Sequence, residues 1–99
     1  MEQLVTTDKV KLKTRIAELE EKIRCQKAVI HFAEYAIKSN MERKNAARRK
    51  PMDYAARKHL LNTYDVRIRQ KRFHLACAEA DIHKYQTELE KLKAHLPEA

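Results

Sequence analysis

Two ladders of apolar residues with a seven-residue step run through this sequence and constrain its fold more than any other feature. A strict seven-residue step keeps one apolar seam of an α-helix facing a partner helix. The pattern therefore predicts two long helices packed along their seams. The first ladder is Ile16, Ile23, Ile30 and Ile37, with Leu12, Leu19 and Ala33 between them, and the second is Leu61, Ile68, Leu75, Ile82, Leu89 and Leu96, with Tyr64, Ala78, Tyr85 and Leu92 between them.

The ladders can pair within one chain if it folds back once. Residues whose numbers add to 101 would then lie side by side, such as Ile16 and Tyr85, and the centre of this register falls beside Pro51. Proline disfavours helix at the residue before it and lacks an amide donor, so it suits a turn. We predict an all-α fold, a long antiparallel two-helix coiled-coil hairpin. The alternative, one continuous helix in a parallel dimer, would have to accommodate Pro51.

The predicted hairpin forms a single domain over residues 1–99. Its first helix is expected over about 8–47, its turn over about 48–52 and its second helix over about 53–96. Thr7 is the expected N-cap of the first helix, since short polar side chains accept hydrogen bonds from the first free amides of a helix. The second helix is expected to begin at Lys50 or at Asp53, with Asp53 as its N-cap in the second case. Pro97 is expected to end the second helix.

Composition agrees with this fold and limits the function. The sequence has no glycine, which sheets and phosphate-cradling loops need for their turns. No catalytic constellation can be derived from the spacing of Ser, His, Cys or acidic residues, so we expect neither an enzyme nor a small-molecule substrate. No apolar run is long enough to span a membrane, and the first residues do not resemble a signal peptide. A cytoplasmic protein, or a nuclear one in a eukaryote, is the expectation.

Positive charge is concentrated around the predicted turn. The formal charge of the chain is +8, and residues 41–72 alone carry +8, whereas residues 1–40 carry +2 and residues 73–99 carry −2. Clusters of this kind attract phosphate backbones, and exposed tyrosines can stack on unpaired bases. The candidate binding residues are Arg43, Lys44, Arg48, Arg49, Lys50, Arg57, Lys58, Arg69 and Arg72, with Tyr54 and Tyr64 as stacking residues.

These residues do not determine which class of partner the chain binds. Nucleic acid, or a machine that processes it, is one partner class. An acidic protein surface is a second, with the chain acting as a small inhibitor or adaptor of the kind that phages and mobile elements encode. A structural coiled-coil spacer with a solvated basic end is a third. The spacing predicts that the arginines spread over several helix faces, whereas a nucleic-acid binder needs them on one continuous face.

A second apolar stripe lies outside the ladders. A two-helix hairpin buries little, and exposed contiguous apolar patches usually mark an interface. We predict that this stripe joins two hairpins into a homodimeric four-helix bundle, with docking of another protein and a wider seam within a monomer as alternatives. The interface candidates are Cys25, Val29, Phe32, Ala36, Val66, Phe73, Cys77 and Ala80.

Polar residues interrupt the seam. Three polar residues fall at seam positions, where a buried polar group can fix the register of two helices: Gln26, Asn40 and Lys71.

No metal or cofactor is expected. His74 and Cys77, with Cys25 at a similar height, supply only three of the four ligands that a structural zinc site needs.

Overall fold

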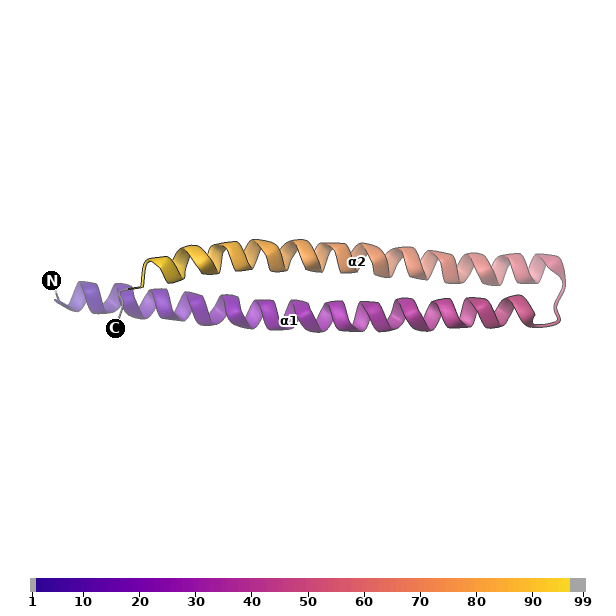
Figure 1. The fold of residues 1–99 in the computed structure, drawn as a ribbon, viewed down its shortest axis with the longest axis horizontal. Helices are drawn as coiled ribbons and strands as arrows, with labels where there is room; N and C mark the ends of the chain where they lie inside the picture. Colours follow the sequence, from indigo (N-terminus) through magenta and orange to yellow (C-terminus); the bar gives the residue numbers. More distant parts are fainter. Residues whose placement is uncertain (1, 97–99) are drawn as a thin grey trace.

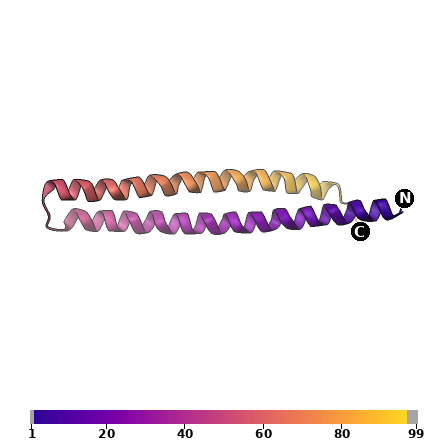
Figure 2. The ribbon, with the colours of Figure 1, turned by 180° about the vertical axis from the view of Figure 1, so that it is seen from behind.

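The computed structural model describes residues 2–96 and confirms an all-helical hairpin. Helix α1 spans Glu2–Arg49 and helix α2 spans Tyr54–Ala94, and they run antiparallel with the turn at one end and both termini toward the other (Figures 1 and 2). The Cα atoms extend over 77 × 16 × 16 Å, so the molecule is a thin rod. Within residues 2–96, neither helix is long and apolar enough to cross a membrane.

The predicted seam holds the two helices together. Every residue of both ladders is buried or half-buried. Leu19 is completely buried, and Ala47, one seven-residue step beyond Asn40, continues the seam toward the turn. The buried apolar residues are Ile16, Leu19, Ile23, Ala33, Ala47, Ile68, Ala78 and Ile82.

The register between the helices differs from the predicted one. Among the described residues, three ion pairs and one cation–π contact join α1 to α2, and their residue numbers add to 103, 107, 109 and 113, around a mean of 108 rather than 101. The helices are therefore displaced by one seven-residue step. The ladder pattern alone cannot detect this shift, because moving one helix by seven residues again places apolar residues opposite apolar residues. The four pairs are Arg15–Glu88, Lys22–Tyr85, Lys44–Asp65 and Glu20–Lys93.

The turn explains the displacement. Helix α1 continues through Arg48 and Arg49, so the turn occupies residues 50–53 instead of 48–52, and α2 begins beyond the end of α1 (Figure 1). Of the two expected starts of this helix, Lys50 and Asp53, the structure has Asp53 as the N-cap: its carboxylate accepts a 2.7 Å hydrogen bond from the amide of Ala56. Arg57 Nη2 donates to the carbonyl oxygen of Lys50 at 2.8 Å, which ties the start of α2 to the end of α1.

The outer helix ends also differ from the prediction. Thr7 does not cap α1, because the helix already begins at Glu2 and residues 2–7 contain no glycine or proline to interrupt it. Helix α2 ends at Ala94, and the amide of His95 closes its last turn on the carbonyl of Leu92 at 3.1 Å. Pro97 lies outside the described residues.

Asn40 is the buried polar residue of the seam, whereas Gln26 and Lys71 are half-buried. The Nδ2 atom of Asn40 donates a hydrogen bond to the carbonyl oxygen of Ala36 at 2.7 Å, but the Oδ1 atom of Asn40 is buried without a hydrogen-bond partner. A buried acceptor without a donor lowers stability, so Asn40 weakens the seam at this level.

Replacing Asn40→Leu should therefore stabilise the hairpin. We expect the free energy of unfolding to rise by roughly 1 kcal/mol, since the unsatisfied acceptor is replaced by an apolar group of similar size. Urea denaturation followed by circular dichroism measures this change. Asn45→Leu, at an exposed position one turn away, is the control and should change stability little. A loss of stability in the Asn40 variant alone would show that the amide supports the seam.

Candidate functional site

The seam divides the rod into two sides. On α1, a residue just before a ladder isoleucine, such as Val29 or Ala36, flanks the seam on one side, whereas a residue just after Asn40 or Ala47 flanks it on the other. The ion pairs across the helices follow this rule. Arg15–Glu88, at 3.0 Å, lies on the Val29 side, and Glu20–Lys93, at 3.8 Å, lies on the opposite side.

Three adjoining grooves follow the second side from the turn inward. The groove at the turn has a volume of about 290 Å³ and shares Asn62 and Asp65 with the next groove, of about 400 Å³. The third, of about 460 Å³, is joined to the second by Arg72. Because neighbouring grooves share lining residues, they form one continuous surface. We call this surface the basic face and define it by Lys44, Arg48, Arg57, Lys58, Arg69 and Arg72.

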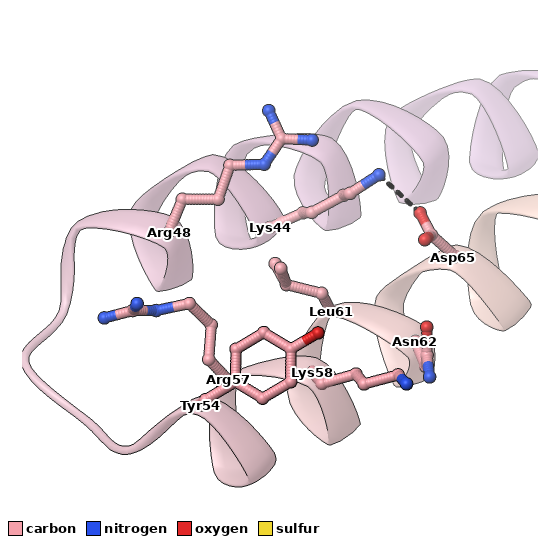
Figure 3. Close-up of a pocket in the computed structure, with 8 residues that line it drawn as sticks. All are labelled: Lys44, Arg48, Tyr54, Arg57, Lys58, Leu61, Asn62 and Asp65. Carbon is pink, nitrogen blue, oxygen red and sulfur yellow. Dashed lines mark ion pairs between the residues drawn. The ribbon is translucent and has the colours of Figure 1, made fainter.

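Both helices contribute to the groove at the turn. Lys44 and Arg48 come from α1, while Tyr54, Lys58 and the other lining residues come from α2, and Leu61 points between the helices (Figure 3). Tyr54 is 78% exposed, so its ring is free to receive a ligand. Arg57 differs from the other cations, because its guanidinium is half-buried and bonded to the carbonyl of Lys50.

One ion pair modifies the charge of this groove. Lys44 Nζ lies 2.5 Å from Asp65 Oδ1 (Figure 3). The hydrogen bond from Lys44 lowers the pKa of the Asp65 carboxyl, and the positive charges of Lys44, Arg69 and Arg48 add to this effect. Asp65 is therefore ionised at neutral pH and neutralises Lys44. Among the described residues, the cations of the basic face without an ion-pair partner are Arg48, Arg57, Lys58, Arg69 and Arg72.

The remaining predicted binding residues lie elsewhere. Arg43 flanks the seam on the Val29 side, and Arg49 and Lys50 lie at the turn but line none of the three grooves. Tyr64 is half-buried in the seam, with the Arg67 guanidinium 5.8 Å from its ring centroid. Tyr54 is therefore the exposed aromatic residue of the basic face.

The basic face also contains residues that the sequence analysis did not select. Lys38 and Asn45 line the third groove together with the carboxylates of Glu34 and Glu42, and Asn62 lines the first two. The seven-residue spacing of Lys58, Asp65 and Arg72 would have found this side of α2, since residues at that spacing share a face of the helix.

The predicted interface residues fall on two surfaces. Val29 and Ala36 flank the seam on the side opposite the basic face, and Phe32 and Cys25 lie beside them; Phe32 is 70% exposed. We call this side the apolar face, with Cys25, Val29, Phe32 and Ala36 from α1 and Cys77 from α2.

The second surface lies on the outside of α2. Val66, Phe73 and Ala80 repeat at the seven-residue position farthest from the seam, so they form a strip one residue wide. Phe73 is 67% exposed, and its ring lies 6.4 Å from that of His74. We call these three residues the outer strip.

In the part of the chain that the structure describes, no group of three or more His, Cys, Asp or Glu side chains could hold a metal ion. Cys25 and Cys77 are exposed free thiols. No protein-family model, curated protein or solved structure matches this chain.

The Lys44–Asp65 pair predicts a pH dependence. Because the pKa of Asp65 is lower in the folded state, the pair stabilises the hairpin at neutral pH. This contribution starts to decrease as the pH falls below about 4, the usual pKa of a carboxyl group. It is lost as the pH falls through the lower pKa that Asp65 has in the folded state. NMR titration should give Asp65 a depressed pKa that Lys44→Met moves back up. Lys58→Met, which removes another cation of the same groove, is the control; an equal effect of both variants would contradict the pairing.

Proposed function

We propose that this chain is a non-enzymatic binding protein whose basic face engages the phosphates of nucleic acid. The observation that supports this most is the continuity of the basic face. Arg48, Lys58, Arg69 and Arg72 line adjoining grooves on one side of a straight rod, instead of spreading over several helix faces. From Tyr54 to Arg72 the face covers about 27 Å, at about 1.5 Å per residue.

Such a face suits a phosphate backbone in charge and in shape. Each phosphate that a cation neutralises releases condensed counterions, which drives binding and makes it depend on salt. Arginine adds paired donors that match phosphate oxygens. The rod is too wide to enter a groove of about 12 Å with both helices, so its contacts fall on the backbone and favour binding without strong sequence preference.

Tyr54 adds a possible contact to unpaired bases. Its exposed ring lies at the start of α2, in the same groove as Arg48 and Lys58. Aromatic side chains beside cations are the usual stacking sites in proteins that bind single strands. If the chain binds single strands more tightly than duplex, stacking of unpaired bases on Tyr54 explains the difference.

An acidic protein surface is the second candidate partner. The same cations would pair with its carboxylates, and Asp65 and Glu34 on the grooves would add selectivity by repelling poorly matched surfaces. In that case the chain would act as a small inhibitor or adaptor. A protein that serves only as a coiled-coil spacer would bind neither partner.

We also propose that the apolar face joins two hairpins into a four-helix bundle. A hairpin with one seam buries little apolar surface, and Val29 and Phe32 remain 42% and 70% exposed. The apolar face is formed by both helices, whereas the outer strip belongs to α2 alone. Since the apolar and basic faces lie on opposite sides of the seam, pairing of two hairpins leaves the basic face accessible.

Charge reversal tests the basic face. The double variant Arg48→Glu and Arg72→Glu should weaken binding to a short duplex strongly and reduce the slope of log affinity against log salt by about 2, one unit per lost contact. Fluorescence anisotropy at several salt concentrations measures both effects. The control is the double variant Lys9→Glu and Lys11→Glu. It changes the net charge by the same amount, but at a place far from the turn. Equal losses in the two variants would mean that overall charge, and not the face, drives binding.

Two phenylalanines of similar exposure test the apolar face. Phe32→Asp should convert a two-chain particle into a single chain, because it places a carboxylate in the proposed interface. Phe73→Asp, on the outer strip, should leave the mass at two chains. Light scattering after size exclusion measures the mass, and circular dichroism checks that both variants stay helical. A single-chain mass for the unmodified protein would refute dimerisation.

A further inference from the structure

The apolar face lies at the middle of the rod. In the observed register, the last residue of α2, Ala94, is level with residue 14 of α1, and the other end of the rod is the turn at residues 50–53. The midpoint between these levels falls beside Phe32. Cys77, on the apolar side of α2, lies within about one residue of the same level. The face therefore lies at the middle of the two-helix part of the rod, where a copy turned end for end covers that part, and α1 extends beyond it.

We infer that the second copy docks antiparallel on the apolar face, with a two-fold axis that crosses the rod near Phe32 and Cys77. This inference rests on the proposed dimer and adds its orientation. With this axis, α1 packs on α1 and α2 on α2 of the second copy. Phe32 meets its own counterpart, Val29 meets Ala36, and Cys77 meets Cys77.

Charge selects this orientation over the parallel one. Residues 41–72 carry the full excess of +8, whereas the rest of the chain is neutral as a whole. A parallel dimer would hold two segments of +8 side by side, which costs Coulomb energy. An antiparallel dimer places each charged segment beside the neutral half of the other copy.

Contacts along the flank of α2 support the same choice. The residues that precede its ladder positions on the apolar side are Arg67, His74, Asp81 and Glu88. Antiparallel docking places Arg67 opposite Glu88 and His74 opposite Asp81. Parallel docking would instead place Asp81 against Val29, which desolvates a carboxylate without a partner. On α1, antiparallel docking does bring Lys22 near Arg43, a like-charge contact at the edge of the interface.

The orientation determines what the dimer can bind. Each basic face lies on the side opposite the interface, so the two faces point away from each other. Their turns lie at opposite ends, about 60 Å apart, since each turn is about 20 residues from the axis at about 1.5 Å per residue, and each face runs from its turn inward to Arg72. One straight duplex cannot touch both faces. The dimer would therefore hold two separate nucleic-acid segments at once.

The two native thiols test the orientation. Mild oxidation with diamide, which takes up the two thiol hydrogens, should join Cys25→Ser chains through Cys77 into a covalent dimer. Cys77→Ser chains should stay uncrosslinked, because Cys25 faces Ser39 of the second copy. A two-chain mass by light scattering without the Cys77 disulfide would overturn the orientation and leave the dimer intact. A single-chain mass would instead refute the dimer itself.

Bridging is measured separately with two labelled duplexes. The protein bound to an immobilised duplex should capture a second, fluorescent duplex, and Phe32→Asp should lose this capture while still binding the first duplex. Capture that persists in this variant would overturn bridging by the dimer. Absence of binding to the first duplex would count against the basic face and not against the orientation, which the thiol test decides alone.

Discussion

One apolar seam holds this molecule together, and the properties of its surface depend on that seam. Each helix has a single buried stripe, so most other side chains stay in contact with water. The seam fixes which residues flank it on each side because neighbouring helical positions turn to opposite flanks. Arg48 and Arg72 are brought to one side in this way, and Val29 and Ala36 to the other. The separation of a basic face from an apolar face follows from where each residue stands relative to the ladders.

The fold could be predicted from sequence because its main signals are periodic and local. The ladders identified the seam residues, and Asp53 was one of the two expected starts of α2. The register could not be predicted in the same way, since a step of seven residues leaves the apolar pattern unchanged. It depends on where α1 ends and on individual contacts such as Lys44–Asp65, which are not periodic. The turn at Pro51 indicated the place of the reversal but not its length.

The candidate site could be predicted only in part, because it too depends on features that are not periodic in the sequence. Charge counting located the cluster around the turn, but the face on which each arginine lies depends on the helix positions relative to the seam. Arg57 illustrates the limit: it belongs to the cluster in sequence, yet its guanidinium binds the carbonyl of Lys50. Tyr64 likewise occupies a ladder position, and its half-buried ring separates it from the exposed Tyr54. Dimerisation and nucleic-acid binding remain proposals that solution measurements decide.

The large buried side chains are distributed unevenly along the rod. Ile16, Leu19, Ile23 and Ile82 lie toward the open end, whereas Ala33, Asn40 and Ala47 fill the α1 seam toward the turn and Ile68 of α2 is buried opposite them. Regions that bury less apolar area open more often, and their amide hydrogens exchange faster. The half of the hairpin around Leu19 is thus the firmer one, and the half beside the turn, although covalently closed, is the more compliant one. The basic face lies on the compliant half, so a bound partner would contact the part of the hairpin that opens more readily.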